Sequence, residues 1–286
     1  MLDAMTIDSA HLRQWLGRVR EDEDEVTLAP ARALAAVLDL DGPAPRRGEA
    51  LPPLWHWLYA LPHERQSAIG SDGHPKRGDF LPPVPLPRRM WAGGRLQFVK
   101  PLRIGEAIRR TSTIADISAK DGRSGPLVFV RVKHEIAGSE GVAIVEEQDI
   151  VYRADPAPDA PAPRPEPAPA GEQYARTVHP EPVLLFRYSA LTFNGHRIHY
   201  DRPYAQDVEG YVGLVVHGPL IATLLVDALA RQQPGVQIAS FSFKAMRPLF
   251  DTADFSVCSR IDAGTAALWA RDAQGFLAMQ ASATLA

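Results

Sequence analysis

The sequence has little cysteine and no long apolar run. Its single cysteine, Cys258, excludes an internal disulfide, and we expect it to be a small buried residue in a strand. No run of roughly 18 apolar residues occurs, and the first 30 residues contain no apolar core of signal-peptide length. The sequence therefore predicts neither a membrane span nor a secretory leader, and the cytoplasm is the default location.

An excess of charge of one sign is also missing. The chain has 31 Lys and Arg against 34 Asp and Glu, a net charge of −3 over 286 residues, and no basic stripe with interleaved aromatics. This composition excludes the electrostatic footprint of a nucleic-acid-binding protein. Glycine-rich phosphate motifs are missing too, because Gly93-Gly94 precedes a predicted strand instead of opening a helix. The acidic run at 21–25 is interpreted as a solvated helix face or turn.

Proline is concentrated in one place. Seven prolines fall between Asp155 and Gly171. Such a stretch forms neither a helix nor a strand ladder and favours an extended polyproline conformation. We interpret 155–171 as a semi-rigid spacer between an N-terminal domain, 1–154, and a C-terminal domain, 172–286.

The two parts of the chain look like copies of one pattern. Residues 96–102 and 243–249 each read as a strand that ends at a cation-Pro-Leu step, followed by an acidic turn and another strand. A helical candidate precedes each set of strands, at 54–61 and at 219–231. The alternating patterns predict strands at 110–119, 126–136, 144–152, 253–261, 265–271 and 276–285. A helix followed by a sheet long enough to wrap it describes an α+β domain, present twice.

The most informative segment runs from Arg187 to Asp201 and contains His196 and His199. After it, His217-Gly218 stands at the start of a predicted helix. A neutral imidazole can act as a general base or acid near neutral pH. Free N–H groups at a helix N-terminus stabilise a developing oxyanion. Together, these two segments could activate a water and stabilise a developing oxyanion, which indicates an enzyme.

This arrangement resembles the MaoC-type hydratase and dehydratase branch of the hotdog fold. The usual pattern there is Asp, any residue, Asn-Pro, any residue, His. The resemblance implies that His199 is the catalytic base and that Gly218 donates its N–H to the thioester carbonyl. Asn194, His196 and Arg197 stand where that pattern has Asp, Asn and Pro. Because an amide cannot act as a base, we expect Asn194 to orient the water with its carbonyl oxygen.

The form Ser-Ala-Leu-Thr-Phe-Asn-Gly-His-Arg-Ile-His-Tyr-Asp is similar to type 2 3-hydroxyacyl-thioester dehydratases. It is also similar to the bacterial mesaconyl-C4-CoA (3-methylfumaryl-CoA) and itaconyl-CoA hydratases. Residues 55–59, 78–83, 89–94 and 122–127 resemble the N-terminal domain of that bacterial group. The resemblance therefore implies a double hotdog in which the first domain is non-catalytic and the second carries the catalytic motif.

The activity implied by this resemblance is that of a hydro-lyase on an enoyl-CoA thioester. The expected reaction is hydration of mesaconyl-C4-CoA or itaconyl-CoA to citramalyl-CoA. CoA is then part of the substrate, and no metal, nicotinamide or flavin is required, because adding water involves no redox step.

The acyl group of such a substrate carries a carboxylate, so a cation is expected in the pocket. Arg89, Arg187 and Arg197 are the candidates, since a guanidinium group binds a carboxylate through two hydrogen bonds. The remaining residues expected around the substrate are His196, His217 and Tyr188.

Several alternatives stay open. The pair His196 and His199, with Asp201 and His217, could ligate a metal, although no known spacing unites them. A 3-hydroxyacyl-thioester dehydratase of fatty-acid metabolism, with an acyl-carrier protein as partner, would use the same motif. A thioester-binding protein without turnover is compatible with the missing aspartate. Exposed sheet edges are consistent with a homodimer.

Overall fold

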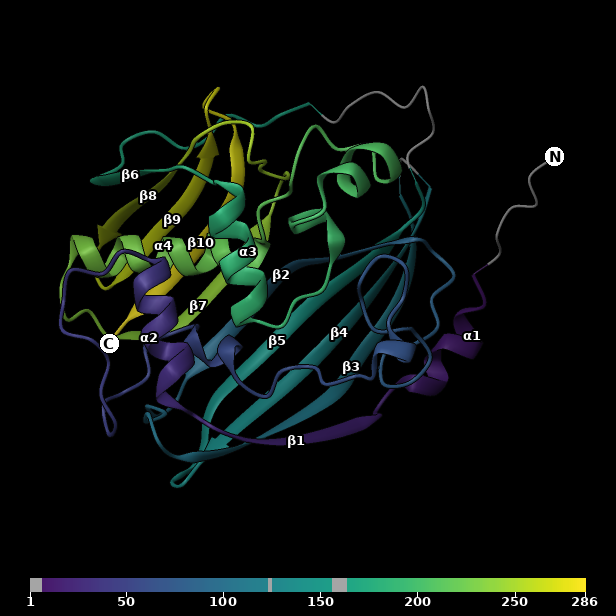
Figure 1. The fold of residues 1–286 in the computed structure, drawn as a ribbon, viewed down its shortest axis with the longest axis horizontal. Helices are drawn as coiled ribbons and strands as arrows, with labels where there is room; N and C mark the ends of the chain where they lie inside the picture. Colours follow the sequence, from purple (N-terminus) through teal and green to yellow (C-terminus); the bar gives the residue numbers. More distant parts are fainter. Residues whose placement is uncertain (1–6, 123–124, 156–163) are drawn as a thin grey trace.

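The computed structural model describes residues 7–122, 125–155 and 164–286, and its main element is one antiparallel sheet. The sheet has 10 strands in the order β1-β3-β4-β5-β2-β7-β10-β9-β8-β6 (Figure 1). The strands of the first half are β1 Val19–Glu25, β2 Arg88–Phe98, β3 Ala107–Gly122, β4 Gly125–Gly138 and β5 Gly141–Arg153. Those of the second half are β6 Tyr174–Val178, β7 Ile238–Ala245, β8 Phe255–Asp262, β9 Thr265–Asp272 and β10 Leu277–Leu285.

The strand order reads the same from both edges of the sheet. The first half contributes 1-3-4-5-2 and the second contributes 6-8-9-10-7, so each strand of one half has a counterpart in the other. The two halves meet where β2 pairs with β7, with Leu96 opposite Phe241. The repeat at 96–102 and 243–249 begins on these two neighbouring strands. The fold is a double hotdog, as predicted.

Three longer helices pack beside this sheet (Figure 1). They are α2 Leu28–Val37, α3 Pro182–Leu191 and α4 Gly218–Gln232. Helix α4 is buried along most of its length and packs against β6, β8, β9 and β10. A helix that is apolar on nearly every side is stable only inside a core. Its one buried carboxylate, Asp227, is paired with Arg176 and Arg231.

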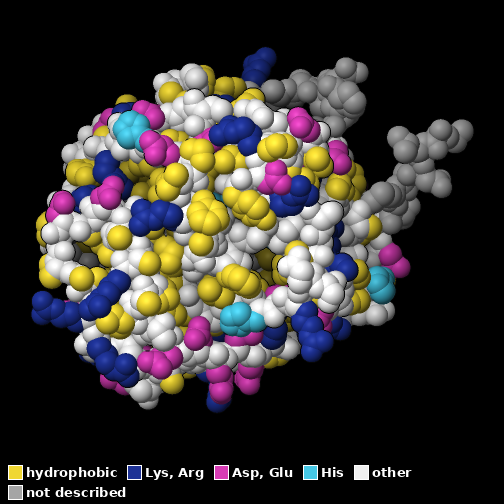
Figure 2. Space-filling model, in the orientation of Figure 1, with side chains coloured by type: hydrophobic (Ala, Val, Ile, Leu, Met, Phe, Trp, Pro, Cys, Tyr) yellow, Lys and Arg dark blue, Asp and Glu magenta, His cyan; other side chains and the backbone are white. Residues whose placement is uncertain are grey.

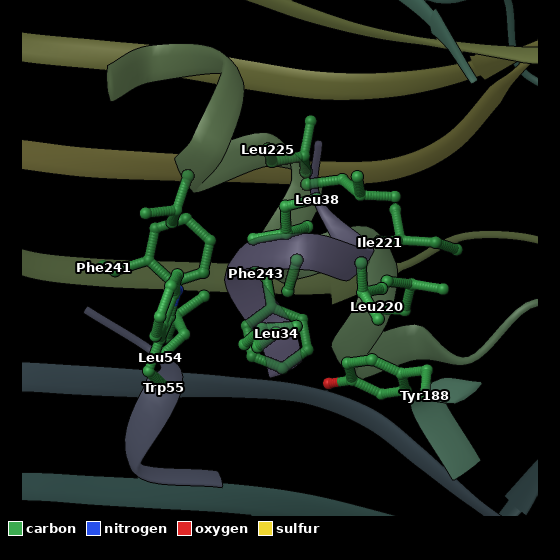
Figure 3. Packing of buried hydrophobic residues seen from close by; sticks show 14 of the residues in the cluster. Leu34, Leu38, Leu54, Trp55, Tyr188, Leu220, Ile221, Leu225, Phe241 and Phe243 are labelled. Atoms are coloured by element: carbon green, nitrogen blue, oxygen red, sulfur yellow. The ribbon is translucent and has the colours of Figure 1, made fainter. Parts of the chain in front are cut away.

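The core is shared by both halves of the chain. Figure 3 shows Leu34 of α2 and Leu38, which caps this helix, near Leu220 and Leu225 of α4 and Phe243 of β7. All five side chains belong to one cluster of buried apolar residues. The two halves therefore bury a continuous, close-packed apolar surface against each other.

The six strands predicted from alternation are confirmed as β3, β4, β5, β8, β9 and β10, and the helix predicted at 219–231 is confirmed as α4. Cys258 lies fully buried in β8, as expected. The remaining short helices are α1 Ser9–Leu12, η1 Arg13–Trp15, η2 Trp55–Leu58, η3 Gln66–Ala68, η4 Arg197–His199 and the π-helical turn η5 Tyr204–Val208. Of the described part of the chain, no helix is long and apolar enough to cross a membrane.

Two predictions of local structure were wrong. The helix expected at 54–61 is only the short 3-10 turn η2. Leu54 before it is left-handed, with a φ of 70°, and the turn ends at the extended Tyr59 and the left-handed Ala60. The longer helix of the first half is α2. The acidic run at 21–25 forms part of edge strand β1, where Asp22 and Glu23 pair with arginines of β3. Charge compensation across the ladder explains why an acidic run is stable as a strand.

Candidate active site

A cavity of about 1080 Å³ lies between the two halves. The first half lines it with side chains that include His74 and Arg89, and the second with Asn194 and Pro219. Ligand pockets commonly enclose about 300–1,000 Å³, so this space can hold an acyl chain together with part of its carrier. Apolar side chains gather over the middle of the face that carries α2 and α3, and this face is hollowed (Figure 2).

The segment that carries the motif reverses direction directly after α3. Phe193 has a left-handed φ of 47°. The Oδ1 atom of Asn194 accepts a hydrogen bond from the backbone N–H of His196 at 2.9 Å. This turn is of the kind that asparagine favours, because its side chain imitates the backbone. It leads into η4, which places His199 beside the first residues of α4.

His199 is 7% exposed, and its Nδ1 lies 2.7 Å from the carbonyl oxygen of Val215. A carbonyl only accepts, so Nδ1 carries the proton and Nε2 keeps a lone pair. No protein partner is found for Nε2 within the described residues, and this atom is not fully buried. Burial lowers the pKa of His199 to about 4. The ring is therefore neutral at pH 7 and can accept a proton.

The imidazole ring of His217 stacks on the ring of His199. The two rings are stacked, with centroids 3.7 Å apart and planes 18° apart. Nε2 of His217 lies 2.8 Å from Oγ of Ser189, and the Tyr188 ring packs edge-on at 5.1 Å. Burial lowers the pKa of His217 well below its usual value. Two neutral rings can stack without charge repulsion, so His217 and Tyr188 fix the orientation of His199.

Gly218 is the first residue of α4, with His217 as its N-cap. The N–H of a first helical residue has no partner inside the helix. A β-carbon on Gly218 would meet only the carbonyl oxygen of Trp91, at 3.9 Å, which is an ordinary contact. Close packing therefore does not require glycine here. The residue leaves an open approach to the amide, next to Pro219 of the cavity wall.

The structure brings the predicted residues of the motif together in one site. Tyr188, Asn194 and Arg197 line the cavity. His196 contacts His74 of the lining and His217 contacts Tyr188, while Gly218 precedes the lining residue Pro219. His199 lies behind them, against His196 and His217. The ring of His196 stands perpendicular to that of His199, with centroids 5.4 Å apart.

The three candidate arginines have different surroundings. Arg187 is exposed on α3. Arg197 lines the cavity, but its Nε and Nη2 donate to one carboxylate oxygen of Asp201 at 2.9 and 2.7 Å. Its Nη1 donates to the backbone carbonyl of Ser71 at 3.1 Å. Arg89 lines the cavity from β2, and no carboxylate partner for it is found in the described ranges.

The set of metal ligands that the sequence left open as an alternative is not the one that the structure assembles. The carboxylate of Asp201 accepts hydrogen bonds from Arg197, and Nε2 of His217 is hydrogen-bonded to Ser189, so these atoms are not free to ligate a metal. A different group, Asp72, His74 and His196, offers ligand atoms within 4.8 Å of one another. These three residues could hold a metal ion, although Nδ1 of His74 and Oδ2 of Asp72 already form a hydrogen bond of 3.0 Å.

Sequence reasoning missed two polar groups of the first half that border the cavity. One is the pair Asp72 and His74. The other surrounds Glu146, which is 2% exposed and accepts hydrogen bonds at 3.0 Å from Trp57 and from Gln148. Burial would raise the pKa of Glu146, but its 3.0 Å contact with His56 and the neighbouring donors lower it to about 2. A polar residue at an inward position of an alternating strand was the available signal.

Comparison with known proteins identifies the family. The family model described as hydroxyacyl-thioester dehydratase type 2 matches residues 54–251. The chain belongs to this family. It is 52% identical over 279 residues to the mesaconyl-C4-CoA hydratase of Chloroflexus aurantiacus, covering 98% of this chain and 99% of the relative.

Solved structures agree with the fold. A MaoC-like dehydratase superposes with a TM-score of 0.73 at 12% identity, over 96% of this chain and 99% of that one. A Mycobacterium tuberculosis protein described as having a double hotdog fold superposes with a TM-score of 0.53 at 14% identity, over 95% and 96% of the two chains. At these identities, the similarity establishes the fold.

Proposed function

We propose that this member of the family is a hydro-lyase that hydrates a branched enoyl-CoA, with mesaconyl-C4-CoA as its substrate and citramalyl-CoA as its product. The observation that carries the proposal is the 52% identity to a mesaconyl-C4-CoA hydratase across 98% of the chain. The geometry of His199 and Gly218 is compatible with this chemistry, because it combines a proton acceptor with a backbone donor.

The reaction follows from the protonation state of His199. Its Nε2 accepts a proton from water while the water oxygen bonds to the β-carbon of the enoyl thioester. The π electrons move toward the thioester carbonyl, where the N–H of Gly218 stabilises the developing oxyanion. The proton on Nε2 then passes to the α-carbon. Water is added across the double bond, and no electrons are gained or lost. CoA enters only as part of the substrate.

Arg89 is the residue that we assign to the free carboxylate of the substrate. It lines the cavity, and in the described part of the chain it is not neutralised by a carboxylate, unlike Arg197. A guanidinium group can bind the substrate carboxylate through two parallel hydrogen bonds. Arg89→Met should raise KM for mesaconyl-C4-CoA by about 10-fold or more and leave crotonyl-CoA, which lacks the carboxylate, nearly unchanged.

Arg187→Met is the matched control, because Arg187 is exposed outside the cavity lining. It should behave like wild type with both substrates. Equal losses for the two substrates in Arg89→Met would refute the assignment of Arg89.

A second candidate function is dehydration of a 3-hydroxyacyl thioester in fatty-acid metabolism. The family description names a hydroxyacyl-thioester dehydratase. One observation favours it. Phe186 and Phe193 border the cavity while 61% and 60% exposed, and Ile108, Ile136 and Ile150 line its wall in the first half. An apolar wall of this length suits an acyl chain longer than that of mesaconate, carried by CoA or by an acyl-carrier protein.

The proposal is tested with the wild-type protein by following loss of the enoyl-thioester absorbance of mesaconyl-C4-CoA and crotonyl-CoA. For itaconyl-CoA, whose double bond is not conjugated with the thioester, formation of citramalyl-CoA is followed by chromatography. We expect mesaconyl-C4-CoA to have the highest kcat/KM. Turnover of crotonyl-CoA alone would favour the fatty-acyl dehydratase. Binding of all three without turnover would indicate a thioester-binding protein instead.

A further inference from the structure

A loop of the first half is fixed directly onto the catalytic segment of the second half. The backbone N–H of Arg197 donates to the carbonyl of Asp72 at 2.9 Å. Gly73 and Gly195 pack backbone to backbone, so closely that a β-carbon on Gly73 would stand 1.7 Å from the Gly195 carbonyl oxygen. These backbone contacts hold the loop around Asp72 and Gly73 in a fixed position against the catalytic segment.

The loop carries an oriented histidine. Nδ1 of His74 lies 3.0 Å from Oδ2 of Asp72, and the backbone N–H of His74 donates to Oδ1 of the same carboxylate at 3.0 Å. Both carboxylate oxygens of Asp72 therefore face nitrogen atoms of His74. Since an ionised carboxylate only accepts, Nδ1 of His74 holds the proton and Nε2 is left as an acceptor.

This histidine belongs to the site. His74 lines the cavity, and its ring centroid is 4.0 Å from that of His196, which in turn contacts His199. The charged and titratable groups around His74 are Asp72, Arg77, Arg89, His196 and His199.

A water that attacks through its oxygen lone pair is oriented by hydrogen bonds from its two O–H groups to acceptors in the site. His199 offers one acceptor. The side-chain oxygen of Asn194 accepts one hydrogen bond, from the backbone N–H of His196, and the NH₂ group only donates. A second acceptor at the cavity wall would orient the other O–H bond. His74 lines this wall, and no partner for its Nε2 is found among the described residues.

We propose that His74, held in this tautomer by Asp72, is a second catalytic histidine that holds the attacking water together with His199. One O–H bond of the water breaks as its proton passes to Nε2 of His199. The other O–H remains donated to Nε2 of His74 while the oxygen bonds to the β-carbon. His199 later returns its proton to the α-carbon. The first half thus contributes to the chemistry, in addition to forming part of the cavity. This inference rests on the proposed hydratase function.

Asp72→Asn tests the positioning role. The amide NH₂ placed opposite Nδ1 would favour the other tautomer of His74, so that Nε2 becomes a donor. We expect kcat to fall by about 10²-fold with KM and the melting temperature little changed. The matched control is the exposed pair His179 and Asp254, joined at 2.7 Å, where Asp254→Asn should leave kcat unchanged. If Asp72→Asn does not fold, His74→Leu removes the acceptor and should show the same fall.

Rescue separates water positioning from a purely structural role. Asn194→Asp retains the acceptor for the His196 N–H and adds a second carboxylate oxygen. In the Asp72→Asn background it should restore kcat by about 10-fold or more. A kcat of Asp72→Asn within twofold of wild type, or no rescue, would overturn the proposal.

Metal dependence is the competing outcome. Loss of activity in EDTA and recovery with Zn²⁺ would show that Asp72, His74 and His196 hold an ion instead of a water, and would also overturn it. A wild-type protein that hydrates none of the enoyl-CoA substrates would instead refute the proposed function. The wild-type rate therefore distinguishes failure of the proposed role of His74 from failure of the proposed hydratase function.

Discussion

Gly73 lies so close to Gly195 that a β-carbon on Gly73 would overlap the Gly195 carbonyl, 1.7 Å away. The φ of Gly73 is +89°, which side chains rarely tolerate. The contact joins a loop of the first hotdog to the catalytic segment of the second, although 122 positions separate the two glycines in the sequence.

Gly73→Ala should therefore displace the loop from the motif. We expect kcat for enoyl-CoA hydration to fall by at least about 10-fold, because small misplacements of catalytic groups are costly. Gly48 also has a positive φ, of +87°, but a β-carbon there would meet nothing within 4 Å. Gly48→Ala controls for backbone strain alone and should retain activity. Equal activity of the two variants would contradict the role of the contact.

The N–H of Gly218 can be removed with little change to the helix. Proline is tolerated at the first helical position, and the ψ of 131° at His217 suits a following proline. Gly218→Pro should lower kcat by about 10²-fold, which is typical for loss of one oxyanion donor. Gly218→Ala retains the N–H and should lose far less. Similar kcat values for the two variants would indicate that this amide does not contact the oxyanion.

Acid should destabilise the protein before its carboxylates titrate. Burial lowers the pKa values of His74, His134 and His199 to about 4, whereas an unfolded histidine has a pKa of about 6.5. Between these values the unfolded state binds more protons. The contribution of these histidines to the free energy of unfolding is therefore complete above pH 6.5. It decreases as the pH falls toward 4, by roughly 1 kcal/mol per pH unit for each histidine.

Urea titrations at pH 7.5 and pH 5 measure this effect. We expect a clearly lower midpoint at pH 5, and a smaller difference between the two pH values in His134→Gln than in wild type. A midpoint that is the same at both pH values would contradict neutral burial of these rings.

Sequence reasoning located one side of the site and not the other. The Arg187–Asp201 segment and the His217-Gly218 step are continuous in the chain, and their residue types directly indicate acid–base chemistry. Asp72 and His74 stand in a loop without periodicity, and only the double-hotdog packing brings them to His196. Tertiary contacts of this kind leave no local signal in a single sequence.

The fold shows the same division. Strands with an inward-facing apolar row that alternates with more exposed residues, such as β4, follow from alternation. The edge strand β1 does not, because an acidic run becomes a strand only when Arg109 and Arg110 of β3 lie opposite it. Helix α2 was missed for a similar reason. Its apolar face is explained by the core that it shares with α4.

The most direct test compares wild type, His199→Ala and His179→Ala in the hydration of mesaconyl-C4-CoA, with acyl-CoA binding measured in parallel. His179 is an exposed histidine in an ion pair, so its variant controls for loss of an imidazole elsewhere. We predict that His199→Ala loses at least about 10²-fold in kcat while still binding the thioester, and that His179→Ala matches wild type. A His199→Ala variant within a few-fold of the wild-type rate would contradict the assignment of His199 as the base.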